Sequence, residues 1–204
     1  RMPMNFDLIS EIMGDLEPED IAHGQSEILR RFVQHRFVQK GFTPSAQAAG
    51  NDLLRTIAAR TLLDGVAARS RDFEARDALP VWSLAEGANT MRQEQIDDVN
   101  ARLAEIETTG LIRPAGPGRY RFCHLNLQDF FIAESLTDLS IIDPKDVDWR
   151  QILLFIAGRP DSAAALKLIE EAKAKDPDPY LDELLEQFVV IRDNHLSTSG
   201  SFNN

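Results

Sequence analysis

The sequence has little cysteine, no long apolar run and a deficit of positive charge. Its 204 residues include a single cysteine, Cys123, which excludes an intramolecular disulfide framework and a cysteine-rich zinc site. The longest uninterrupted apolar run, Ile152 to Ala157, is far shorter than the roughly 20 residues of a membrane span. The 22 Lys and Arg residues against 33 Asp and Glu give a net charge of −11, so the overall field repels nucleic-acid phosphate.

Signals for secretion and for catalysis are also missing. The sequence opens without a secretory signal, which together with the single cysteine predicts a cytoplasmic location. It begins at Arg1 rather than Met, and we expect it to be a piece of a longer protein. It contains no G-x-x-x-x-G-K-[ST] phosphate loop, no G-x-G-x-x-G and no H-E-x-x-H, and no Ser/His/Asp or Cys/His arrangement suggests a nucleophile. On its own the chain is therefore predicted to be no enzyme and to hold no metal and no cofactor.

Helical periodicity dominates what is present. We predict a mainly α protein, in which a helical bundle and a winged-helix domain with a small β-hairpin are followed by further helices. Ser26 is the expected N-cap of a helix that ends at Gly41, and Thr43-Pro44 is the expected start of the next helix. The other predicted helices cover residues 5–14, 78–88, 93–108, 128–139, 149–157, 162–175 and 180–193.

The middle of the chain carries the β signals. A short strand is predicted around Phe73, and two more at Leu111-Ile112 and Tyr120–Leu125, joined by a turn at residues 114–118. Two helices followed by such a hairpin give the order of a winged-helix domain. The predicted divisions are a helical domain at 1–42, the winged helix at 43–139, a second helical segment at 140–196 and a disordered tail at 197–204.

One stretch within this region resembles a family signature. Residues 122–133, FCHLNLQDFFIA, are similar to the F-x-H-x-x-x-Q-[DE]-[FY]-x-x-A pattern in the winged helix of NACHT-type signalling NTPases of the STAND class. The Gly110-Leu-Ile112 step before it, the Pro3 element near the start and the segment from Trp149 to Gly158 also resemble that family, in the same order.

The resemblance implies a nucleotide switch whose Walker-bearing core lies outside this chain. His124 would donate a hydrogen bond to a phosphate of ADP and hold the closed state, and Pro3 would pack against the adenine. ADP or ATP with Mg²⁺ would bind the parent protein, with its adjacent nucleotide-binding domain as partner and self-association on activation. Whether the parent hydrolyses ATP slowly is left open.

Plainer interpretations of the same residues stand beside these. His124 is also consistent with a hydrogen-bonded residue of the core or its rim, and Pro3 with an ordinary helix-start proline. Gln128 and Asp129 suit the beginning of a helix, where an acidic residue favours the dipole. Phe122, Phe130, Phe131 and Leu136 are expected in the core, and Cys123 is expected to be inert and to point away from His124.

Two other functions remain in competition. The first is a helical scaffold or adaptor, which would be favoured if the winged helix were absent. The second, less favoured, is a DNA-binding winged helix, whose wing would be basic through Arg113, Arg119 and Arg121. Against DNA binding, the expected recognition helix at 93–108 is rich in Asp and Glu, so nucleic acid is an unlikely partner.

Overall fold

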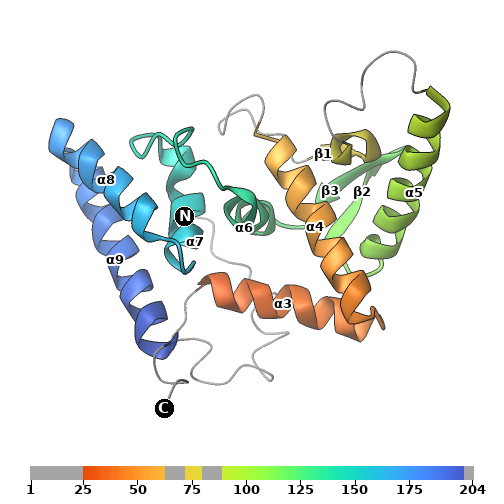
Figure 1. The fold of residues 1–204 in the computed structure, drawn as a ribbon, viewed down its shortest axis with the longest axis horizontal. Helices are drawn as coiled ribbons and strands as arrows, with labels where there is room; N and C mark the ends of the chain where they lie inside the picture. The colour runs from red at the N-terminus through yellow and green to blue at the C-terminus, as the bar shows by residue number, and fades with distance from the viewer. Residues whose placement is uncertain (1–24, 63–71, 80–88, 200–204) are drawn as a thin grey trace. The chain divides into compact units, whose positions relative to one another are not determined.

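The structure, a computed structural model, describes residues 25–62, 72–79 and 89–199. It is mainly α-helical with one small antiparallel sheet, as the sequence predicts (Figure 1). The described elements are α3 (Gln25–Gln39), α4 (Pro44–Arg60), β1 (Asp72–Glu74), the 3₁₀ helix η1 (Ala75–Ala78), α5 (Asn89–Glu107), β2 (Ile112–Gly116), β3 (Arg119–Phe122), α6 (Leu125–Ser135), the 3₁₀ helix η3 (Val147–Trp149), α7 (Arg150–Ala157), α8 (Ala163–Lys175) and α9 (Pro179–Ser199).

These elements divide into two compact units. Residues 33–131 form one, and residues up to Phe32 together with those from Ile132 form the other, so the division falls inside α3 and α6. We call residues 33–131 the winged-helix unit and the remainder the helical unit. The boundaries predicted from sequence, after residues 42 and 139, stay predictions.

The winged-helix unit takes its name from its element order. α4, β1, η1, α5 and the β2–β3 hairpin follow one another, and the strands pair antiparallel in the order β1-β3-β2. The strand predicted around Phe73 is confirmed as β1, and in Figure 1 the hairpin lies between α4 and α5. The core contains Leu54, Ile57, Phe73, Leu103, Ile106, Phe122 and Phe131, all nearly inaccessible to solvent.

Local sequence explains how the helices of this unit begin and end. Thr43 caps α4, accepting a hydrogen bond from the amide of Ala46 (3.3 Å), and Pro44 is the first helical residue, both as predicted. After α5, Gly110 adopts a φ of +75°, and a Cβ there would lie 2.9 Å from Nη2 of Arg36. The left-handed backbone favours glycine, because a side chain with a Cβ is strained there, and it lets the chain turn from α5 into β2.

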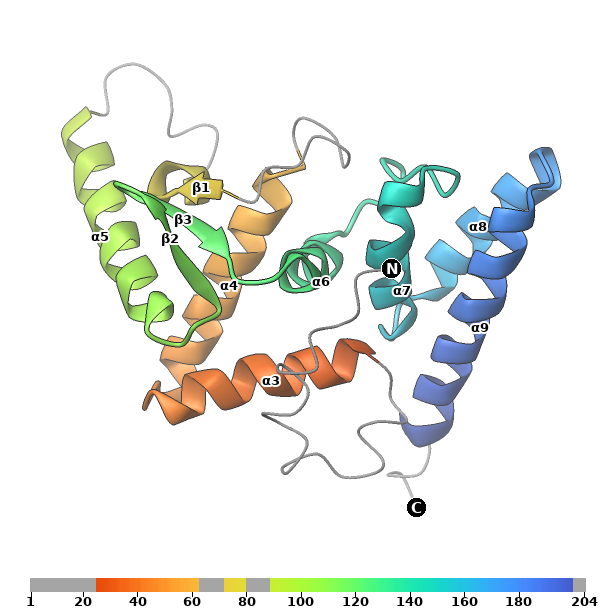
Figure 2. The ribbon, with the colours of Figure 1, turned by 180° about the vertical axis from the view of Figure 1, so that it is seen from behind.

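The helical unit is built on α7, α8 and α9, which pack on one another (Figure 2). Its buried apolar residues include Leu29 and Phe32 of α3, Ile152, Leu153, Phe155 and Ile156 of α7, Ala165 and Ile169 of α8, and Leu181, Leu184 and Phe188 of α9. α9 continues to Ser199, so residues 197–199 of the predicted disordered tail are helical. The rest of that tail, the helix predicted at 5–14 and residues 80–88 of the one predicted at 78–88 lie outside the described residues.

The prediction of Ser26 as an N-cap is wrong. α3 begins at Gln25, and the buried Ser26 hydroxyl donates to the carbonyl of Phe155 at 3.0 Å instead of accepting from its own helix. The partner is 129 residues away in sequence, so local spacing cannot distinguish this serine from a cap.

Candidate functional site at the start of helix α6

His124 lies just beyond the wing hairpin, where the chain enters α6. The predicted strand Tyr120–Leu125 is too long, because β3 ends at Phe122 and α6 already begins at Leu125. The helix predicted at 128–139 accordingly starts three residues earlier and ends at Ser135. Strand alternation therefore does not fix the direction of His124; the helix start does.

The ring of His124 takes part in the capping of α6. Its Nδ1 accepts a hydrogen bond from the backbone amide of Asn126 at 3.1 Å, and its carbonyl accepts from Leu127 at 3.2 Å. An imidazole nitrogen that accepts a hydrogen bond carries no proton, so the neutral ring has its proton on Nε2. His124 is half-buried. The ring thus uses Nδ1 to cap the helix and lies beside the positive end of the helix dipole.

Aromatic packing holds β3, the strand that precedes His124, in place. The Phe122 ring is buried, with its centroid 5.2 Å from that of Phe73 in β1 and 6.0 Å from that of Phe131 in α6. Phe131 in turn meets Phe130 edge to face at 5.3 Å. The predicted core positions Phe122, Phe130, Phe131 and Leu136 are all buried. The end of β3 and the start of α6 are therefore held by one aromatic cluster.

Gln128 and Asp129 do more than begin the helix. They are the fourth and fifth residues of α6, and both side chains are buried. Gln128 Nε2 donates to Oγ1 of Thr61 at 3.0 Å, and Thr61 donates in turn to the carbonyl of Ala58 at 2.7 Å. This pair ties α6 to the end of α4. No local pattern in the sequence marks Thr61, and only the place of Gln128 in the family signature hints at it.

Cys123, next to His124, is unsuited to nucleophilic chemistry. Burial raises the pKa of its thiol to about 11, outweighing the opposite effect of the nearby Arg36 and Arg113 charges. The thiol stays protonated at neutral pH, and the thiolate is the reactive form. Among the described residues, no three or more His, Cys, Asp or Glu side chains form a group that could hold a metal ion.

The arginines of the wing are largely engaged by β1. Asp72 lies directly opposite Arg121 in the sheet register and Glu74 opposite Arg119. Both carboxylate oxygens of Asp72 accept from Arg121, one of them at 3.1 Å, and Arg119 lies 3.8 Å from Asp72 and 3.9 Å from Glu74. The hydrogen bond from Arg121 lowers the pKa of Asp72. This pairing reduces the positive potential on which a DNA-binding wing depends.

The remaining features do not add to the site. A pocket of about 280 Å³ between α4 and α5 is lined by Phe42, Thr43, Ser45, Ala46, Ala49, Gly50, Arg102, Glu105 and Ile106, and does not include His124. Pro3, the second predicted nucleotide contact, lies outside the described residues. No described helix combines the length and apolar character that crossing a bilayer requires.

Comparisons with known proteins do not assign the chain to a family. Neither family models nor curated proteins nor solved structures gave a match to the chain.

Proposed function

We propose that this chain is the regulatory helical and winged-helix segment of a nucleotide-controlled signalling switch of the NACHT type. In the parent protein it stabilises the closed, ADP-bound state through the adjacent nucleotide-binding domain, and opening leads to self-association in the cytoplasm. The chain itself performs no catalysis; ATP or ADP with Mg²⁺ binds the parent's core. The proposal is supported by the resemblance of residues 122–133 to the NACHT signature and by the geometry of His124.

The observation that carries the proposal is the bonding of the His124 ring. Because Nδ1 accepts from Asn126, the ring is oriented by the helix that it caps and its proton lies on Nε2. A fixed imidazole N–H at a helix N-terminus is suited to a phosphate oxygen, since the helix dipole and the first-turn amides also favour an anion there. Such a contact made only in the closed state would bias the switch toward closure.

The alternative functions fit the described residues less well. A purely helical scaffold has no need of the β1-β3-β2 sheet that completes the winged-helix unit. A DNA-binding wing would need cations facing phosphate, whereas Arg121 and Arg119 face Asp72 and Glu74. The nucleotide switch accounts for both the fold and the histidine.

The test separates the two tasks of His124 in the parent protein. His124→Leu removes the cap and the donor, so we expect it to lower the free energy of unfolding by about 0.5–2 kcal/mol and to weaken ADP retention by tenfold or more, for one lost hydrogen bond to a charged group. His124→Asn retains a good capping side chain but is too short to offer the same donor. We expect it to keep the stability and still lose ADP.

Two measurements decide the outcome: thermal unfolding for stability and filter retention of labelled ADP for closure. Wild-type ADP retention in both variants would reject the assigned role of His124. A parent sequence with no phosphate loop within roughly 150–200 residues before Arg1 would reject the switch as a whole.

A further inference from the structure

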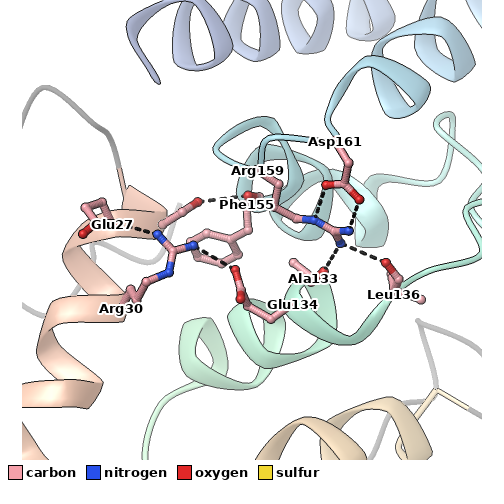
Figure 3. Close-up of polar contacts among 9 residues, drawn as sticks. Glu27, Arg30, Ala133, Glu134, Leu136, Phe155, Arg159 and Asp161 are labelled. Atoms are coloured by element: carbon pink, nitrogen blue, oxygen red, sulfur yellow. Dashed lines mark hydrogen bonds and ion pairs between the residues drawn. The ribbon is translucent and has the colours of Figure 1, made fainter. Parts of the chain in front are cut away.

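The C-terminal end of α6 is capped by an arginine from another part of the chain. The last carbonyls of a helix lack partners within it, and the last turn of α6 contains no basic residue. Arg159, in the turn between α7 and α8, donates from Nη1 to the carbonyl of Ala133 at 2.5 Å and to that of Leu136 at 2.9 Å (Figure 3). One guanidinium nitrogen therefore satisfies two carbonyls at the end of α6.

Asp161 holds this guanidinium in place. Arg159 Nε donates to Oδ1 of Asp161 at 2.8 Å, and Nη2 forms the second bond of a bidentate pair with Oδ2 (Figure 3). The Arg159 side chain is only 14% exposed while that of Asp161 is 65% exposed. Because the carboxylate occupies Nε and Nη2, Nη1 is aimed at α6, a geometry that the planar fork of arginine allows and lysine does not.

The same turn also meets α3. A Cβ on Gly158 would lie 2.9 Å from Oγ of Ser26, the hydroxyl that donates to the carbonyl of Phe155 near the end of α7. One turn further along α3, Arg30 donates to Glu134 of α6 at 3.0 Å. We call Ser26, Arg30, Glu134, Gly158, Arg159 and Asp161, with the carbonyls they bind, the Arg159 junction. At this junction polar bonds join α3, α6 and α7.

We propose that the Arg159 junction is a conformational latch. With Arg159 engaged, the last turn of α6 is held against the turn between α7 and α8. When its bonds to the Ala133 and Leu136 carbonyls break, that last turn is released while α7–α9 stay folded. We expect the release to be local because α7, α8 and α9 pack on one another, with Leu153, Phe155 and Phe188 among their buried residues. Opening breaks these bonds and exposes the few buried apolar residues of that turn, such as Ile132 and Leu136, which costs less than unfolding the core of α7–α9.

Every contact of this latch lies within the helical unit, so the latch can be tested on this chain without a nucleotide. One consequence does rest on the proposed function. Since α6 carries His124 at its N-terminal end, the latch acts on the opposite end of the helix that would read the nucleotide.

The test is amide hydrogen exchange on the 204-residue chain. Arg159→Met keeps the apolar stem and removes all donors, so we expect exchange of the amides in residues 132–136 to rise about tenfold or more, as for one or two lost charge-assisted bonds. Amides in α7 and α9 should change far less. Arg150→Met is the matched control: Arg150 bonds Glu183 and Gln187 in the same unit, and its loss should leave residues 132–136 unchanged.

Two further variants keep the proposal testable if Arg159→Met folds poorly. Asp161→Asn leaves Arg159 in place but weakens its alignment, and Arg159→Lys keeps the charge without the fork; both should raise exchange of residues 132–136 by a smaller factor. Unchanged exchange there in all three Arg159 and Asp161 variants would overturn the latch. So would an equal rise throughout α7, α8 and α9, because Arg159 would then support the whole unit.

Discussion

The pairing of one residue, Asp72, with Arg121 makes the free energy of unfolding depend on pH. A carboxylate whose pKa is lowered in the folded chain stabilises the fold fully above its unfolded pKa, and loses that contribution as the pH falls through the folded pKa. The hydrogen bond from Arg121 lowers the pKa of Asp72 below its ordinary 3.8. Its contribution is therefore complete above about pH 5 and declines below about pH 4.

We expect Asp72→Asn to lower the free energy of unfolding at pH 7 and to approach the wild-type value as the pH is lowered from 4 toward 2. Urea unfolding of both proteins at several pH values measures this difference. The matched control is Asp52→Asn: Asp52 pairs with Arg55 along α4 and its side chain is 74% exposed, so its removal should have little effect at any pH. A gap between wild type and Asp72→Asn that stays constant down to pH 2 would contradict the assigned cause.

Single residues also show where sequence reasoning succeeds. Thr43 and Pro44 were predictable because an N-cap bonds an amide three residues away. Ser26 was not, because its hydroxyl bonds Phe155 across 129 positions. His124 falls between these cases: its partner Asn126 is local, but an imidazole rarely caps a helix, and the apolar residues on both sides of it favour a strand. The inertness expected of Cys123 agrees with its raised pKa.

At the scale of elements, periodicity gives the existence of helices more reliably than their ends. α5, α7 and α8 lie within a few residues of the predicted helices, because each buries a regular apolar stripe. α6 begins three residues before the predicted start, because His124 caps its first turn and no apolar pattern marks that turn. α9 extends to Ser199 through polar residues in which no apolar period continues. Ends fixed by capping or by distant contacts leave little trace in local hydropathy.

Gly50 provides a test of packing between elements. It lies inside α4, where glycine costs about 1 kcal/mol relative to alanine on helix propensity. A Cβ at this position would lie 2.9 Å from Cζ of Phe37, whose ring is fully buried. Because the ring is fully buried, making room for the methyl group requires the ring to shift within the core, so we expect Gly50→Ala to lower the free energy of unfolding by about 1–3 kcal/mol despite the better propensity.

The check is a double-mutant cycle with Phe37→Leu, measured by thermal or urea unfolding. The smaller side chain should make room for the methyl group, so Gly50→Ala should cost less in the Phe37→Leu background than in the wild type. An exposed helical site, Ala48→Gly, calibrates propensity in the same helix and should destabilise by about 1 kcal/mol. Stabilisation by Gly50→Ala in the wild type would show that Phe37 gives way.

For the whole molecule, the described residues fall into two compact units. The winged-helix unit contains His124 and the first residues of α6, and the helical unit contains the last residues of α6 and the Arg159 junction. The net charge of −11 repels nucleic-acid phosphate, and within the winged-helix unit Arg121 pairs with Asp72. The sequence predicted the mainly α class and the three strands. The bonds between elements at the Arg159 junction join residues 23 to 129 positions apart, and no local pattern reveals them.

The 204-residue chain on its own should bind ADP and ATP only weakly. Residues 1–204 contain no phosphate loop, so His124 and Pro3 would offer ADP one hydrogen bond and one packing face. Together these supply roughly 2–4 kcal/mol before costs, whereas association alone costs about 4 kcal/mol or more. We therefore expect isothermal titration of the 204-residue chain with ADP or ATP and Mg²⁺ to give no dissociation constant below about 1 mM, which corresponds to a binding free energy of about 4 kcal/mol.

His124→Leu should behave like the wild type in this titration, because the phosphate contact that it removes needs the nucleotide-binding core of the proposed parent. Micromolar binding by the wild-type chain that His124→Leu abolishes would place the nucleotide site within these 204 residues and refute the division of labour proposed for the parent.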